Sequence, residues 1–211
     1  WREARDGEQL RAGVAEIMAT HGEAVMKPAR GRGGRGVCVI RSDISGVHAH
    51  AGGRELHMDL ATFEREYSSD LGVAGPNVVM RRLVEPVYDV DMLAWNGDPV
   101  RVVARRRVNS VLPNEGHTIV DNSDLAELGR RLITGLGLSW LYDCDVMYDA
   151  DGQPGILEIN PRPSGSVAAT IVAGVPLLDD MISLAKGETP PDIEVPVGRT
   201  VVPYRALAVA G

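Results

Sequence analysis

Residues 142–162 read YDCDVMYDADGQPGILEINPR, and this stretch decides the fold. Acidic and apolar residues alternate before Asp151-Gly152, a dipeptide favoured in two-residue hairpin turns, and alternate again after it. We therefore predict two antiparallel strands, over residues 140–149 and 155–160. Because successive side chains of a strand point to opposite faces, Asp143 and Asp145 should share one face of the first strand.

The length of the turn predicts which acids face each other. A two-residue turn pairs Ala150 with Gln153, which places Asp145 opposite Glu158 and Asp143 opposite Asn160. Facing carboxylates about 5 Å apart repel each other, and a divalent cation between them would remove that repulsion. Hard oxygen ligands favour Mg²⁺ or Mn²⁺ over zinc. The sequence therefore predicts a metal site at Asp145 and Glu158, with Asp143 left out of it.

Two alternatives to this metal site stay open. A three-residue turn would shift the pairing by one residue and place Asp145 and Glu158 on opposite faces. The hairpin could also be a solvated acidic surface, although the apolar Ile156, Leu157 and Ile159 around Glu158 argue against that.

A glycine-rich segment over residues 31–36 formally matches the dinucleotide-binding pattern GxGxxG. That pattern needs a helix directly after it, and here an apolar strand-like run over residues 37–40 follows instead. We predict a hairpin in which Lys27 ends the first strand and the glycine loop closes over a polyphosphate through its backbone N–H groups. An ordinary hairpin tip is the alternative.

The composition of the 211 residues limits the class of protein. The chain is 44% hydrophobic and 24% charged, which excludes disorder for most of it. A net charge of −7 argues against a sequence-independent grip on nucleic acid. We expect no membrane partner, since no long apolar run exists. Cys38 and Cys144 lie in apolar runs, so we expect buried, reduced thiols in a cytoplasmic protein.

The order of the expected elements predicts an α+β fold with antiparallel sheets. Asn96-Gly97 is a strong hairpin signal between two strands. A loop is expected over residues 42–58, and an irregular tail from Pro190. Helices are expected over residues 6–21, 59–69, 122–136, 164–173 and 176–186, and further strands over residues 77–84, 88–95 and 99–108.

Arginines are the candidate anion-binding side chains of the second half. Arg162 follows Asn160 between two prolines, where its guanidinium could neutralise a transferring phosphoryl group; a surface salt bridge is the alternative. Residues 105–107 are three consecutive arginines, and one or two of them could hold a substrate carboxylate. Plain solvated charge remains the alternative for these three.

Taken together and in this order, Lys27, the glycine loop, Asp145 and the run from Glu158 to Arg162 resemble the ATP-grasp superfamily. The similarity extends from about residue 8 to 188 and is greatest to the carbamoyl-phosphate-synthase-like ATP-grasp domain. It implies two α+β lobes with antiparallel sheets that grip ATP. The lobes would cover residues 1–80, with the flap, and 81–190, with the metal site, followed by a tail over 191–211. Because the chain begins at Trp1, we expect an upstream N-terminal domain to be missing.

The resemblance also implies roles for individual residues. Lys27 and Arg162 resemble the catalytic cations of the family, and Gly33 and Gly34 resemble its flap glycines over the phosphates. Metal ligands and nucleotide contacts follow by position: Asp145, Glu158 and Asn160 for Mg²⁺ or Mn²⁺, and Arg82, Leu83, Val84 and Glu85 for ATP.

The activity implied is that of a ligase, which activates a carboxylate as an acyl phosphate for attack by an amine or a similar nucleophile. Its partners would be small-molecule carboxylates and amines, in a possible homodimer. One departure from the family supports an alternative. Arg81 stands where the hinge usually carries an acid, so a non-catalytic nucleotide-binding module with a regulatory or assembly role is also considered.

Overall fold

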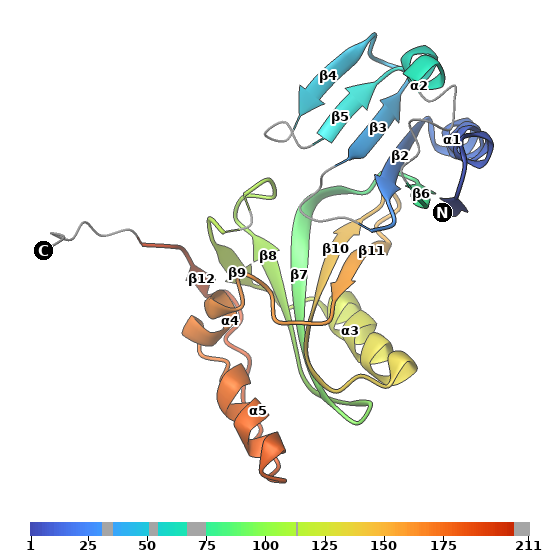
Figure 1. The fold of residues 1–211 in the computed structure, drawn as a ribbon. Coiled ribbons are helices and arrows are strands. Elements are labelled where there is room, and N and C mark those ends of the chain that lie inside the picture. The colour runs from blue at the N-terminus through green and yellow to red at the C-terminus, as the bar shows by residue number, and fades with distance from the viewer. Residues whose placement is uncertain (31–35, 51–54, 67–74, 113, 205–211) are drawn as a thin grey trace, which may run out of the picture. The chain divides into compact units, whose positions relative to one another are not determined.

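The computed structural model describes residues 1–30, 36–50, 55–66, 75–112 and 114–204. The chain divides into two compact units, Trp1–Arg82 and Leu83–Gly211. Each unit has its own six-stranded sheet and its own hydrophobic core, so each is described by itself (Figure 1). The fold is α+β, as the order of the elements predicted.

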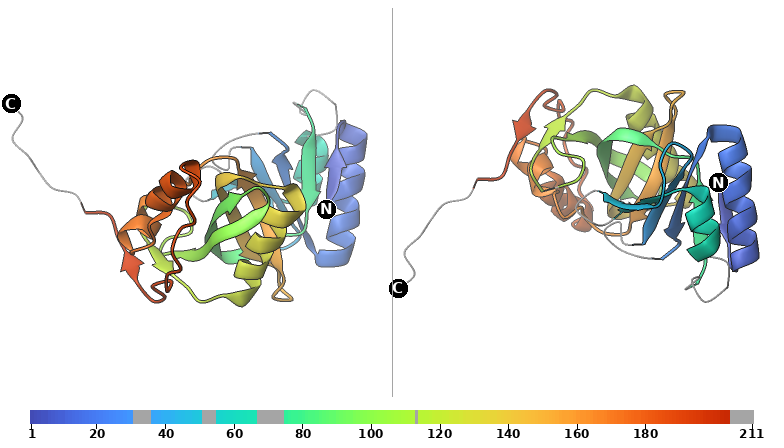
Figure 2. Two further views of the ribbon diagram at one scale, coloured as in Figure 1. Left: turned by 90° about the horizontal axis from the view of Figure 1, so that it is seen from below. Right: turned by 90° about the horizontal axis from the view of Figure 1, so that it is seen from above.

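The first unit is a mixed sheet with both of its helices on one face. Its elements are β1 (Arg2–Ala4), α1 (Gly7–His21), β2 (Glu23–Pro28), β3 (Val37–Arg41), β4 (Val47–His50), β5 (Glu55–Met58), α2 (Leu60–Glu66) and β6 (Asn77–Met80). The strands lie in the order β1-β6-β2-β3-β5-β4. Leu10 and Val14 of α1 and Phe63 of α2 pack into one core with the sheet. Figure 2 shows both helices on the same side of this sheet.

The second unit is an antiparallel sheet with helices on both faces. Its elements are β7 (Val84–Trp95), β8 (Asp98–Arg107), β9 (His117–Ile119), α3 (Ser123–Leu136), β10 (Trp140–Tyr148), β11 (Pro154–Asn160), α4 (Ala168–Val172), α5 (Leu177–Ala185) and β12 (Thr200–Val201). The strand order is β11-β10-β7-β8-β9-β12. Figure 1 shows α3 on one side of this sheet and α4 and α5 on the other.

Alternation along β7 assigns its residues to these two faces. Val90 and Met92 pack in the core under α3, whereas Leu93 packs in the core that includes Leu177 of α5. Since neighbouring side chains of a strand point to opposite faces, Asp89 and Asp91 lie on the Leu93 face. The acids of β7 are therefore on the side of the sheet opposite α3.

Local sequence signals account for the main boundaries. Asn122 caps α3 by accepting a hydrogen bond from the backbone N–H of Leu125, and Gly137 ends this helix in the left-handed region with a φ of 60°. The β7–β8 turn has positive φ at both Asn96 (50°) and Gly97 (85°), which confirms the predicted hairpin. Cys38 and Cys144 are free and buried, as expected.

Two stretches differ from the sequence-based expectation. Residues 42–58 contain β4 and β5 rather than only a loop, and β5 pairs parallel to β3, so the first sheet is not purely antiparallel. The strand signal of β4 is weak because its side chains are small or polar apart from Val47, which is itself exposed. After Pro190, Ile193 and Val195 pack against the core of the second unit, and β12 pairs with β9.

No helix in the described part of the chain has the length and apolar character that crossing a membrane requires.

Candidate functional site

Acidic side chains line up across three strands of the second sheet. On either side of β10, Asp145 pairs with Glu158 and Asp89, while Asp143 pairs with Asn160 and Asp91. Directly paired residues of antiparallel strands point to the same face. The face opposite α3 therefore presents two rows of oxygen-bearing side chains: Asp89, Asp145 and Glu158 in one row, and Asp91, Asp143 and Asn160 in the next. These six residues form the acidic face of the sheet.

The predicted pairing of the acids is confirmed, but the predicted turn is wrong. The backbone N–H of Asp149 donates to the carbonyl of Gln153 at 3.0 Å, which leaves three residues in the turn instead of two. The Asp149 side chain stabilises this longer turn by accepting from the N–H groups of Asp151 and Gln153. A β-bulge at Leu157 then restores the register, because Val146 pairs with Ile156 while Asp145 pairs with Glu158.

Arg105 is buried within the sheet and is paired with Asp91. Both side chains are 0% exposed, and two hydrogen bonds of 2.8 and 3.0 Å join them. Arg105 Nη1 also donates to the hydroxyl and the carbonyl of Ser166, and the Thr170 hydroxyl donates to Asp91. The idea that Arg105 holds a substrate carboxylate, or is solvated, is therefore wrong: its guanidinium is already engaged and has no access to solvent.

Arg107 joins two acids of the first row. Its Nη2 atom lies 2.8 Å from Asp89 and 2.8 Å from Asp145, and its Nε atom donates to the second oxygen of Asp89. Burial opposes ionisation of Asp89, but the hydrogen bonds and charge of Arg107, together with the charges of Arg105 and His117, outweigh it and lower the pKa of this carboxyl. His117 also lies close to this carboxyl, with Nδ1 3.4 Å from Oδ2 of Asp89. Asp89 is therefore a fixed negative charge at neutral pH.

The two acids of β10 are held in a less favourable environment. Burial raises the pKa of Asp143 to about 7, and repulsion from Asp145 and Asp89 adds to the shift. Burial likewise raises the pKa of Asp145 to about 6, against the attraction of Arg107 and together with repulsion from Asp89 and Glu158. A bound cation would favour the ionised form of both carboxyls.

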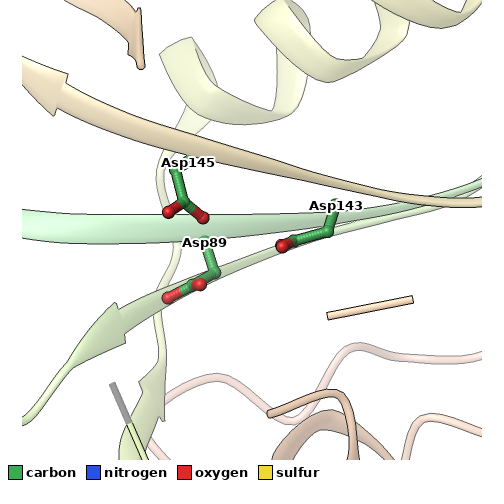
Figure 3. Close-up of side chains that lie close together, drawn as sticks. All are labelled: Asp89, Asp143 and Asp145. Atoms are coloured by element: carbon green, nitrogen blue, oxygen red, sulfur yellow. The ribbon is translucent and has the colours of Figure 1, made fainter. Parts of the chain in front are cut away.

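Asp89, Asp143 and Asp145 form a possible cation-binding group. One carboxylate oxygen from each residue lies within 4.8 Å of those of the other two. Figure 3 shows the three side chains converging from two strands. The donor set is oxygen only, and Oδ1 of Asp143 is buried without a hydrogen-bond partner among the described residues. These residues fit a hard divalent cation.

The other predicted ligands lie next to this group on β11. Glu158 is exposed and accepts a hydrogen bond of 3.0 Å from Nδ2 of Asn160. Arg162 is exposed as well; its Nη1 donates to the Pro163 carbonyl at 2.8 Å and its Nη2 to Oδ1 of Asn160 at 3.4 Å. The second unit therefore brings together Asp145, Glu158, Asn160 and Arg162 at one end of β11.

The predicted nucleotide contacts are divided between the two units. Lys27 lies in β2 opposite Val78, and the Arg82 side chain pairs with Glu23, both within the first unit. Leu83 is buried in the second unit, close to Gly155, while Val84 and Glu85 are exposed at the start of β7. Gly33 and Gly34 lie outside the described residues.

A family model described as "ATP-grasp in the biosynthetic pathway with Ter operon" matches residues 74–207. The chain belongs to this ATP-grasp family. The match spans the whole acidic face, from β7 to β11, and confirms the resemblance to the ATP-grasp superfamily. No curated protein sequence matches the chain.

Solved structures share the ATP-grasp fold. The ADP complex of purK, an N5-carboxyaminoimidazole ribonucleotide synthetase, has a TM-score of 0.58 and 18% identity, with 95% of this chain and 48% of that chain covered. The biotin carboxylase domain of Hydrogenobacter thermophilus 2-oxoglutarate carboxylase, in complex with MgADP, ADP and bicarbonate, has a TM-score of 0.61 and 14% identity. The match covers 92% of this chain and 42% of that chain. The ATP-grasp ligase PsnB, in complex with minimal precursor, Mg and ADP, has a TM-score of 0.54 and 18% identity, and the match covers 88% of this chain and 53% of that chain. At these identities the likeness concerns the fold, and the chain spans about half the length of these structures.

Sequence reasoning missed part of the acidic face. Asp89 and Asp91 were not singled out, and Asp143 was set aside. The available signal was the alternation of acids with apolar residues in β7. An acid between two core positions points to the face of the sheet away from those positions, and if it is buried there it needs a partner on that face. Arg107 could not be assigned to Asp89 and Asp145, because that bridge joins three strands.

Proposed function

We propose that this chain is the ATP-binding part of an ATP- and Mg²⁺-dependent ligase. The reaction activates a carboxylate as an acyl phosphate, and an amine or a similar nucleophile then displaces the phosphate. The substrates are a small-molecule carboxylic acid and a small-molecule amine. Two of the solved structures with this fold hold ADP together with magnesium, which supports the choice of nucleotide and metal.

One observation carries the proposal: in a chain of the ATP-grasp family, Asp145 and Glu158 are directly paired across β10 and β11, with Asn160 and Arg162 next to them. Two facing carboxylates and an amide oxygen suit magnesium, which is commonly held by one or two carboxylates and by phosphate oxygens. An exposed arginine at the same place suits the negative charge of a phosphoryl group.

The roles proposed for the residues follow from their positions and charges. Asp145, Glu158 and Asn160 hold the metal, which when bound screens the negative charge of the phosphates. Arg162 stabilises the phosphoryl group in transfer, and Lys27 binds a phosphate from β2. Gly33 and Gly34 cover the phosphates through their backbone N–H groups. The hinge backbone at Arg82, Leu83 and Val84 contacts the adenine, and Glu85 the ribose.

The test is phosphate release from ATP in the presence of a panel of carboxylic acids and amines. The variant Glu158→Gln should lower the rate at least about tenfold, because a metal ligand is lost. Its melting temperature should stay within about 2 °C of that of the wild type, since Glu158 is exposed. Glu188→Gln is the matched control, at an exposed glutamate outside the acidic face. Unchanged phosphate release in Glu158→Gln would refute the role of this carboxylate.

A non-catalytic nucleotide-binding module is the second candidate. Arg107 favours it, because a guanidinium already contacts Asp145, the carboxylate proposed to bind metal. Calorimetry separates the two candidates: both bind MgATP, and only the ligase releases phosphate when the correct acid and amine are supplied. Binding of MgATP without phosphate release across the whole panel would favour the module.

A further inference from the structure

Asp143 is a buried acid of the second sheet that lacks a counter-charge. The residue is 3% exposed, and its Oδ1 atom has no hydrogen-bond partner among the described residues. Within the same part of the chain, the hydrogen bond to its Oδ2 atom is a long one of 3.5 Å, donated by Nδ2 of Asn160. In the described part of the chain Arg107 pairs with Asp89 and with Asp145, but no ion pair reaches Asp143. Such a carboxylate is costly to bury unless something binds to it.

The carboxylate of Asp143 is directed into a group of suitable size. In Figure 3 the carboxylate of Asp143 is directed towards Asp89, and Asp145 lies beside both. The three ligand oxygens lie within 4.8 Å of one another. Oxygens on opposite sides of a cation are separated by twice the metal–oxygen distance, which is about 4.2 Å for Mg²⁺ and about 4.8 Å for Ca²⁺. The separations of the three oxygens are therefore within the range that a shared divalent cation allows.

Charge balance also favours a cation at this place. When all three carboxyls are ionised, their negative charge exceeds the positive charge of Arg107, the guanidinium that contacts them among the described residues. His117 also lies close, with Nδ1 3.4 Å from Oδ2 of Asp89. Arg107 holds Asp89 in one orientation through two hydrogen bonds, and it would compete with a bound cation for this carboxylate. A dication would offset this excess, and Asp143 offers it a carboxylate that takes part in no ion pair among the described residues.

We propose that Asp89, Asp143 and Asp145 hold a hard divalent cation, Mg²⁺ or Mn²⁺, in the absence of any nucleotide. This position shares only Asp145 with the metal ligands of the proposed ligase, and it includes neither Glu158 nor Asn160. It requires no phosphate oxygen, so it does not depend on the ligase activity. A cation held here would fix the side chain of Asp145 before ATP binds.

The experiment measures Mn²⁺ binding to the full chain without nucleotide, by electron paramagnetic resonance of the free ion. The wild-type chain should bind about one Mn²⁺, and Asp143→Asn should weaken the binding at least about tenfold. Asp98→Asn, at an exposed aspartate in the β7–β8 hairpin, is the control for loss of one charge, and it should stay within about threefold of the wild type. Glu158→Gln should weaken the binding less than Asp143→Asn does, because Glu158 is not a ligand here, although it lies directly opposite Asp145.

Thermal unfolding provides a second readout for the same variants. Asparagine has the shape of aspartate and relieves the repulsion, so Asp143→Asn should fold, and Mn²⁺ should raise the melting temperature of the wild type but not of this variant. The proposal is overturned if the wild type binds no Mn²⁺ without nucleotide, or if Asp143→Asn binds it equally well. A loss in Glu158→Gln as large as that in Asp143→Asn would also overturn it. A chain that binds Mn²⁺ but releases no phosphate contradicts the ligase proposal alone.

Discussion

Replacing Arg105 by methionine should destabilise the second unit more than any exposed arginine substitution does. Methionine retains an unbranched side chain of similar reach but removes the guanidinium from Asp91. Asp91 then remains buried without its counter-charge, because both side chains are 0% exposed and water cannot take the place of the arginine. The hydrogen bonds that Arg105 donates to Ser166 are lost as well.

The size of this effect follows from the burial of the pair. Removing one partner of a buried ion pair costs about 3–5 kcal/mol of unfolding free energy. Solvent does not screen the attraction between Arg105 and Asp91, since neither side chain is exposed. For a unit of this size, such a loss lowers the melting temperature by at least about 6 °C. Arg130→Met is the matched control: Arg130 and Glu127 are about half exposed, so the expected change is within about 0.5 kcal/mol.

Urea unfolding followed by tryptophan fluorescence is a suitable assay. Trp95 and Trp140 form an edge-to-face pair in the second unit, with ring centroids 4.8 Å apart, and so report its unfolding. The double variant Arg105→Met with Asp91→Leu removes both charges, and it should return to within about 2 kcal/mol of the wild type. The reasoning fails if Arg105→Met costs less than about 1 kcal/mol, or if the double variant is less stable than Arg105→Met.

Two further predictions concern the acidic face and the helix behind it. Arg107→Met should lower the melting temperature in EDTA, because Asp89 and Asp145 lose the guanidinium that pairs with them. Mn²⁺ should raise the melting temperature more in this variant than in the wild type, since Arg107 no longer competes with the metal for these carboxylates. An equal or smaller rise would contradict this. Gly129→Ala in α3 should destabilise by about 1–2 kcal/mol in thermal unfolding, since the added Cβ would lie 2.6 Å from Cγ1 of Val102. Gly135→Ala in the same helix has open space and should stabilise by about 0.5–1 kcal/mol; the same sign for both would contradict the packing argument.

The acidic hairpin shows how far pattern reasoning reaches. Alternation in β10 and β11 predicted that Asp145 faces Glu158, and the structure confirms that pairing. The route was different, because a turn one residue longer is compensated by the bulge at Leu157. A turn and a bulge that cancel each other are invisible to a pattern that counts positions from the turn. The pairing therefore agreed with the prediction although the predicted turn did not occur.

Pattern reasoning could not predict the group of Asp89, Asp143 and Asp145 or the partners of the buried arginines. Asp89 reaches Asp145 only because β7, far earlier in the chain, pairs with β10. The three consecutive arginines at the end of β8 are equivalent in the sequence pattern, yet Arg105 is enclosed with Asp91, and Arg107 bridges two carboxylates. Which cation is buried depends on strand order and on the segment that includes α4, where Ser166 contacts Arg105 and Thr170 contacts Asp91.

Local sequence signals were enough to predict the α+β class, the α3 helix and the Asn96-Gly97 turn, because each depends on residues close together in the chain. The partners of each charge were settled by the assembled second sheet. Its strand order brings carboxylates and guanidinium groups from distant segments to within hydrogen-bond distance, away from water, where an unpaired charge is too costly to persist.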